Sequence, residues 1–221
     1  MRAIKASKSS ESGRMFESDF FEFFSHIHPW QPPLFFIPII TGSAWIGLRE
    51  GVGVLASIGM FFAGLVVWTL LEYWLHRVVF HYHPTSALGK RLIWLLHGVH
   101  HDWPYDKLRL VFPPTLSLPL AALFFMIFTS AVGESLRWPL FSGLTFGYLS
   151  YDMIHYWVHH YSPKSKVGRF LRRYHLEHHF KNPDSGYGVS NPLWDFVFGT
   201  TPPSKGRDNG EVSEPANAVQ P

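Results

Sequence analysis

The chain has 221 residues and a formal net charge of +3, with 47% hydrophobic but only 16% charged residues. This balance excludes an intrinsically disordered protein, which has few apolar and many charged residues. The absence of cysteine excludes disulfide bonds, thiolate metal sites and cysteine nucleophiles. Histidine stands out, with 14 residues gathered mostly in clusters, and we expect no nucleic-acid partner.

The N-terminal residues 1–31 are predicted to form an arm with one short amphipathic helix. Five apolar residues recur at helical spacing between positions 16 and 28, with acidic residues on the opposite side. Such a helix lies on a membrane surface with its apolar face in the lipid. The apolar residues are Phe16, Phe20, Phe23, Phe24 and Ile27, and Phe21 interrupts the pattern.

Four blocks without charged residues follow, at 32–48, 52–71, 111–132 and 138–151. A helix needs about 20 apolar residues to cross a bilayer. The second and third blocks have this length, the first reaches it with tilt, and the fourth continues into a more polar stretch. We therefore expect an all-α integral membrane protein with four transmembrane helices in two hairpins. The alternative is a set of buried helices in a soluble protein.

The distribution of basic residues predicts the orientation in the membrane. Of the 19 Lys and Arg residues, only Arg49 and Arg137 lie in the two short hairpin turns. Basic residues are enriched on the cytoplasmic side, so both termini and a helical cap are expected there. The basic start of the chain leads into an acidic stretch, which does not resemble a cleavable signal. Residues 32–201 are expected to form the membrane domain, and the Pro/Gly-rich residues 202–221 a disordered tail.

Ten histidines form four clusters, all on the predicted cytoplasmic side. Imidazole is a common ligand of zinc, copper and iron, and ten imidazoles exceed the coordination shell of one ion. The simplest arrangement is two ions with about five ligands each; hydrogen-bonded core histidines are the alternative. The candidate ligands are His76, His81, His97, His100, His101, His155, His159, His175, His178 and His179.

The spacing within the clusters predicts how they share the two ions. His155 and His159 are four residues apart and share a helix face. In each His-x-x-His-His motif we expect the first two rings to bind one ion, and the third, turned by about 100°, to bind the other. His76 and His81 are five apart, which predicts a distorted or ending helix. Four further histidines fit no cluster: His26, His28, His83 and His160.

Carboxylates beside the clusters are candidates to orient the ligand rings. A metal-bound imidazole usually donates its other N–H to a carboxylate or a carbonyl. Asp152, three residues before His155, is the best such candidate, and Tyr151 is a candidate to line the site. The other carboxylates are Glu72, Asp102 and Glu177. No Glu-x-x-His pair of the soluble di-iron bundles and no His-Glu-x-x-His protease motif occurs.

These motifs resemble the fatty acid hydroxylase/sterol desaturase superfamily of integral membrane non-haem di-iron oxygenases. The resemblance covers roughly residues 65–200 and lies in three segments around the clusters, at 97–114, 151–160 and 173–180. The segment from Gly186 to Thr200 resembles the fatty acid 2-hydroxylases in particular. The resemblance implies that the ten clustered histidines hold two iron ions, with zinc able to replace iron in purified protein.

The resemblance further implies hydroxylation at C2 of a fatty acyl chain, free or in a sphingolipid or ceramide-type amide, with O2 as co-substrate. Eukaryotic 2-hydroxylases commonly carry a cytochrome b5 domain before the first span, and no His-Pro-Gly-Gly haem motif appears here. We therefore expect a separate electron donor, cytochrome b5-like or ferredoxin-like. The expected location is the bacterial inner membrane, or otherwise the endoplasmic reticulum.

Three alternative functions remain open at this stage. One is another oxidation within the superfamily, such as sterol or carotenoid hydroxylation or desaturation. The second is a poly-histidine zinc hydrolase of lipids, which needs neither O2 nor a reductant. The third is a metal transporter or storage protein, against which the first three apolar blocks speak, because they contain no ionisable residue for a transmembrane path.

Overall fold

A computed structural model of the chain describes residue 7 and residues 9–203. Every regular element in these residues is a helix, which confirms the all-α prediction. Most of the predicted tail, residues 204–221, lies outside the described residues. The elements are α1 (Asp19–Phe23), α2 (Gln31–Arg49), α3 (Val54–Trp74), η1 (Leu75–Phe80), α4 (Ala87–Ile93), η2 (Trp94–Gly98), α5 (Val99–Asp102), α6 (Pro114–Val132), α7 (Arg137–His160), α8 (Lys166–Phe180) and α9 (Leu193–Phe198), where η marks a π-helix.

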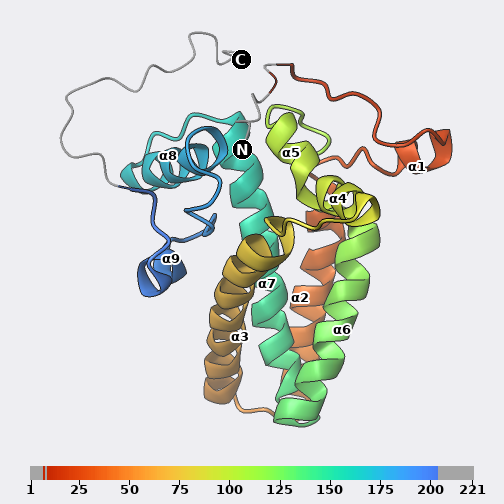
Figure 1. Cartoon of the computed structure of the whole chain (residues 1–221). Coiled ribbons are helices and arrows are strands. Elements are labelled where there is room, and N and C mark those ends of the chain that lie inside the picture. Colours follow the sequence, from red (N-terminus) through yellow and green to blue (C-terminus); the bar gives the residue numbers. More distant parts are fainter. Residues whose placement is uncertain (1–6, 8, 204–221) are drawn as a thin grey trace.

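The four long helices α2, α3, α6 and α7 form a bundle, and the shorter helices gather at one of its ends (Figure 1). Short turns join α2 to α3 and α6 to α7 at the opposite end. Gly51 and Gly133 lie in these turns with φ of 85° and 83°, a conformation that glycine adopts at no steric cost. Helix α7 is central, since it packs against α2, α3 and α6.

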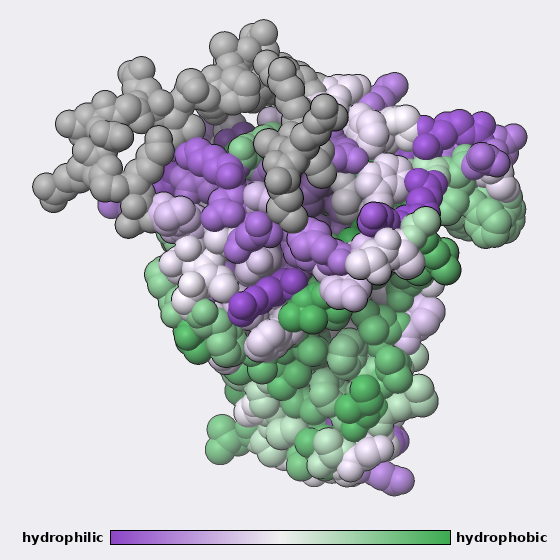
Figure 2. All heavy atoms as spheres, in the orientation of Figure 1, coloured by the Kyte–Doolittle hydropathy of each residue, from purple (hydrophilic) through white to green (hydrophobic). Residues whose placement is uncertain are grey.

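The outer surface of the bundle is apolar. Two helical segments, Val54–Phe80 and Pro114–Val132, are long and apolar enough to cross a membrane, and only 11% and 6% of their most apolar windows are buried. Core helices of a soluble protein would be mostly buried, so this exposure argues against that alternative. On the face that Figure 2 shows, the surface of the bundle is mostly apolar and the coloured surface of the cap is mostly hydrophilic. An uncovered apolar surface of this extent is typical of contact with lipid.

Close contact between α3 and α7 depends on glycine. A Cβ atom added at Gly143 would lie 1.8 Å from the carbonyl oxygen of Phe61, and one added at Gly64 would lie 2.0 Å from that of Leu140. The two backbones therefore touch at these positions, as small residues allow in helix pairs within membranes. This contact fixes α7, and with it the imidazoles at its end, against α3.

We predict that Gly143→Ala lowers the stability of the protein because the new methyl group forces α3 and α7 apart. Overpacking of this kind costs about 1–3 kcal/mol, and here the obstacle is backbone rather than a movable side chain. Thermal unfolding in detergent should show a melting temperature lower by several degrees. The matched control is Gly59→Ala on α3, where no atom lies within 4 Å of the added Cβ. Equal melting of the two variants would contradict the close contact.

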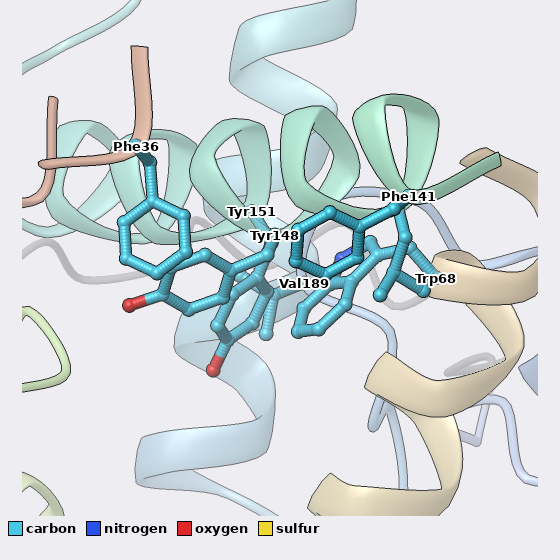
Figure 3. Packing of buried hydrophobic residues seen from close by; sticks show 7 residues of the cluster. Phe36, Trp68, Phe141, Tyr148, Tyr151 and Val189 are labelled. Carbon is cyan, nitrogen blue, oxygen red and sulfur yellow. The ribbon is translucent and has the colours of Figure 1, made fainter. Parts of the chain in front are cut away.

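An aromatic cluster fills the bundle just below the cap (Figure 3). Trp68 of α3 lies 5.3 Å from Tyr148 and 5.7 Å from Tyr151, both of α7, measured between ring centroids. Phe36 of α2 lies 4.6 Å from Tyr148. Edge-on and tilted pairs at these distances add stability beyond the area they bury. The cluster therefore fixes three helices relative to one another next to the histidines.

The N-terminal arm differs from the predicted helix over residues 16–28, because α1 is only five residues long. The carboxylate of Glu22 accepts hydrogen bonds from the backbone N–H groups of Met15 and Phe16, and it also pairs with Arg109. These bonds fold the chain back before α1 and prevent an earlier helix start. After α1, Ile27 turns inward and is buried, so it does not share the exposed aromatic face.

Candidate metal centre

The first pair of histidines lies where α3 changes into a π-helix. In η1 the hydrogen bonds run from residue i+5 to residue i, and the N–H of His81 donates to the carbonyl of His76 at 3.1 Å. The change brings the two Nε2 atoms to 3.2 Å from each other. The predicted distortion of the helix at this five-residue spacing is confirmed. Without it, the two rings would point to different sides of an ideal helix.

The ten clustered histidines come together in two groups of five. Within each group the potential ligand nitrogens all lie within 4.8 Å of one another. The first group comprises His76, His81, His97, His101 and His178, and the second comprises His100, His155, His159, His175 and His179. Each group draws on three separate parts of the chain, so only the fold can assemble it.

The way in which the His-x-x-His-His motifs divide between the groups differs from the prediction. In both motifs the first and third histidines belong to one group and the middle histidine to the other. The prediction that the first two rings act together was therefore wrong. A residue four positions on lies about 40° to one side of the first, and a residue three positions on about 60° to the other. Each helix passes between the two groups and serves both.

The contacts inside each group match a shared metal ion better than hydrogen bonds. The Nε2 atom of His175 lies 2.9 Å from that of His159 and 3.0 Å from that of His179. A neutral imidazole nitrogen offers either one proton or one lone pair, which cannot properly satisfy two such neighbours. Two nitrogens bound at right angles to one ion, each about 2.1 Å from it, would be about 3.0 Å apart. The residues present therefore fit a metal ion in each group.

Two further nitrogens support the same assignment. The Nε2 atoms of His155 and His178 are buried and have no hydrogen-bond partner in the described part of the chain. Buried polar atoms are rarely left without a partner, and each exception calls for an explanation. A metal ion in each group would take up these lone pairs.

Burial also keeps the imidazoles in the form that binds metal. It lowers the pKa of His97, His100 and His175 well below the ordinary value, and repulsion between neighbouring imidazoles lowers the pKa further. Burial likewise lowers the pKa of His178 to about 4. The rings are therefore neutral at physiological pH, and their lone pairs need no deprotonation before an ion binds.

The two groups are direct neighbours. The rings of His101, in the first group, and His179, in the second, stack with centroids 4.1 Å apart and an angle of 18° between their planes. The ring centroid of His97, in the first group, lies 5.6 Å from that of His100, in the second. Two ions held in these groups would therefore share one site.

The four carboxylates predicted to orient the ligands have other partners. Asp152 accepts a hydrogen bond from the backbone N–H of Phe112, and Asp102 accepts one from the indole N–H of Trp94. Glu177 forms an ion pair with Lys181. Glu72 accepts hydrogen bonds from the backbone N–H groups of Val189 and Ser190. No hydrogen bond in the described residues joins any of them to a candidate ligand. Tyr151 stacks on His155 with ring centroids 5.7 Å apart, and so lies beside the second group.

Backbone carbonyls of the loop after α8 take the place predicted for carboxylates. The carbonyl of Tyr187 lies 2.5 Å from Nδ1 of His76, and that of Ser185 lies 2.8 Å from Nδ1 of His178. A carbonyl can only accept, so each Nδ1 carries the proton and Nε2 presents its lone pair. Both rings belong to the first group. The loop therefore sets the tautomer of two of the five histidines in the first group.

Asp195 holds this loop in place, and the sequence analysis did not identify it. It is completely buried and accepts hydrogen bonds from the backbone N–H groups of Tyr187 at 2.9 Å and Gly188 at 2.7 Å. Glu72 accepts from the next two N–H groups, those of Val189 and Ser190, at 2.7 Å each. A single carboxylate within the apolar segment Leu193–Phe198 was the signal that could have revealed it.

The sequence matches the family model described as fatty acid hydroxylase over residues 61–200, which contain all ten histidines of the two groups. The chain belongs to the fatty acid hydroxylase family. The family resemblance drawn from the histidine motifs is thereby confirmed.

Relatives within this family extend the similarity over most of the chain. A dihydroceramide fatty acyl 2-hydroxylase of Arabidopsis thaliana is 42% identical over 197 residues, which cover 87% of this chain and 81% of that protein. The fatty acid 2-hydroxylase of Rattus norvegicus is 33% identical over 213 residues, covering 87% of this chain and 57% of that protein. A solved structure of full-length Scs7p, with only the hydroxylase domain visible, is 37% identical with a TM-score of 0.81, and covers 85% of this chain and 72% of that one.

We predict that His178→Ala lowers the metal content of the purified protein, because the first group loses one of its five nitrogens. Metal analysis by mass spectrometry should show less than the wild-type amount per chain. The control is His83→Ala, which removes an exposed imidazole outside both groups. Full metal content in His178→Ala would reject His178 as a ligand.

We also predict that Asp195→Asn weakens metal binding by the first group and leaves the second intact. The amide cannot accept from both loop N–H groups as the carboxylate does, so the carbonyls on His76 and His178 lose their fixed position. Loss of such indirect support typically costs about 10–100-fold in metal affinity. A metal titration should show two binding steps, one with lowered affinity for the first group and one with unchanged affinity for the second. Asp184→Asn, on an exposed part of the same loop, is the control; equal weakening of both steps would indicate general unfolding instead.

Proposed function

We propose that this protein is a membrane monooxygenase that hydroxylates C2 of a fatty acyl chain, free or in a ceramide-type amide. The observation that carries the proposal is the pair of adjacent five-imidazole groups at the end of a bundle with an apolar outer surface. The printed names of the relatives, a dihydroceramide fatty acyl 2-hydroxylase and a fatty acid 2-hydroxylase, support the position of the reaction and the substrate class.

All four long helices are proposed to span the membrane. Helix α2 shares a turn with α3, and α7 shares a turn with α6. If α3 and α6 cross the membrane, α2 and α7 therefore cover the same depth. Helix α2 has 19 residues and is about 28 Å long, close to the thickness of the hydrocarbon core. Helix α7 carries polar residues, but its central place in the bundle keeps them away from lipid. The basic residues support a cytoplasmic metal centre and cytoplasmic termini.

The exposed aromatic residues of α1 are proposed to lie in the membrane interface beside the bundle. Phe20, Phe21, Phe23 and Phe24 are all exposed. Their rings form three contacting pairs, Phe20–Phe21, Phe20–Phe24 and Phe23–Phe24, with centroids between 5.0 and 5.5 Å apart. Trp30, also exposed, directly precedes α2. Aromatic residues at this position next to a membrane helix favour the interface.

The ten imidazoles are proposed to hold two iron ions, with zinc able to occupy the same nitrogens. Iron bound there supplies the activation of O2 that an unactivated C–H bond requires and that no side chain can provide. The chain contributes neutral nitrogen donors, fixed by the loop carbonyls and by burial. The two electrons per turnover are proposed to come from a separate electron-transfer protein.

Polar groups near the second imidazole group offer a place for the polar end of the substrate. Oδ2 of Asp152 and the hydroxyls of Tyr148 and Ser117 are buried next to one another, and no hydrogen bond of good geometry in the described residues satisfies them. Asp152 precedes His155 by less than one helical turn. C1 of an acyl group is bonded directly to the reacting C2, so its carbonyl must lie close to the metal centre. The hydroxyls of Tyr148 and Ser117 are proposed to donate to this carbonyl, while the acyl tail lies between the helices.

The test is lipid mass spectrometry of cells that express the wild-type protein or His155→Ala. We expect 2-hydroxy fatty acids to rise with the wild-type protein, to stay at the level of control cells with His155→Ala, and to depend on O2. Exposed His83→Ala, outside both groups, should behave like the wild type. Oxidation at another carbon or on a sterol would point to a different reaction of the superfamily. Lipid cleavage without O2 would point to a hydrolase, and metal flux without product to a transporter.

A further inference from the structure

Helix α8 and the turn just before it carry a set of basic side chains, here called the basic face: Lys164 before the helix, and Lys166, Arg169 and Arg173 on it. All four are exposed. The surrounding residues 153–176 contain no Asp or Glu, and no member of the basic face forms an ion pair within residues 9–203. Clustered basic residues without acidic neighbours produce a strong positive potential. The basic face is therefore complementary in charge to a negatively charged partner.

The same helix carries histidines of both imidazole groups on its other side. Residues advance by about 100° each, so Lys166 lies about 180° from His175, and Arg169 about 180° from His178. His178 belongs to the first group and His175 to the second. Arg173, two residues before His175, lies about one helix thickness, roughly 10–12 Å, from the metal centre, and Lys166 and Arg169 lie farther along the helix axis.

We propose that the basic face is the docking surface for a small acidic protein that carries one electron at a time. The inference rests on the proposed function, which consumes two electrons per turnover. In each cycle O2, two protons and the two electrons convert one C–H bond into C–OH and release one water, so two carriers are oxidised in succession. Complementary charge speeds such transient encounters and orients the partner.

An alternative occupant is the anionic headgroup layer of the membrane, and the geometry speaks against it. The imidazoles of α8 point toward those of α7, as the contact between His175 and His159 shows. The basic face, on the opposite side of α8, therefore points away from the bundle. In Figure 1, α8 lies at the end of the bundle where the shorter helices gather, and Figure 2 shows a hydrophilic surface over this part of the molecule.

The experiment uses the full-length protein in phosphatidylcholine nanodiscs and two soluble probes, an acidic [2Fe–2S] ferredoxin and the haem domain of a cytochrome b5. The affinity of each oxidised probe is measured at low and at high salt. For at least one probe we expect wild-type binding to weaken with salt, and Lys166→Glu with Arg169→Glu to weaken it at least tenfold. The matched control is Lys90→Glu with Lys107→Glu, two exposed basic residues elsewhere on the cap, which should change the affinity less than twofold.

Several outcomes would overturn the proposal: no binding of either probe, unchanged affinity in the α8 variant, or equal loss in the control variant. A separate measurement distinguishes this failure from failure of the hydroxylase function. When dithionite supplies the electrons in a single turnover, the α8 variant should form as much 2-hydroxy product as the wild type. If the wild type forms none, the proposed function fails while the binding result remains valid. Less product from the α8 variant alone would show damage to the metal centre and overturn the docking role.

Discussion

The structure depends on holding ten neutral imidazoles together at one end of a membrane-type bundle, eight of them buried and two, His81 and His101, half-buried. Burial of so many polar rings is costly unless their nitrogens find partners. The rings cannot satisfy one another, because several Nε2 atoms face two others at about 3 Å. The arrangement therefore fits one metal ion in each group, and it needs a rigid surrounding to hold the rings in place. Much of the chain serves to provide that rigidity.

The rigidity comes from backbone contacts as much as from side chains. Glycine at positions 64 and 143 lets α3 and α7 touch, which fixes His76 relative to His155. The π-helical turn in η1 then places His81 beside His76, where a regular helix would not. Local irregularity of this kind is frequent at functional sites. Here it allows one helix end to supply two nitrogens to the same group.

The loop after α8 links the site to the rest of the fold through two buried carboxylates. Glu72 and Asp195 together accept four consecutive backbone N–H groups, from Tyr187 to Ser190. Carboxylates that bind N–H groups in this way fix a loop without touching the candidate ligand rings themselves. The ligands meet carbonyl oxygens instead, which are neutral. This arrangement leaves the first group of nitrogens without any nearby negative charge from these residues.

The sequence by itself determined the helical class, the four long helices, the ten histidines and the family, because these follow from composition, periodicity and short-range motifs. It did not determine how the motifs divide between two groups or which atoms orient the rings. The middle histidines, His100 and His178, change groups relative to the expected pattern because each helix passes between the two sites. Asp152 lies close to a ligand in sequence yet binds Phe112 instead. Only the tertiary structure decides such matters, since they depend on where distant segments meet and not on spacing along one helix.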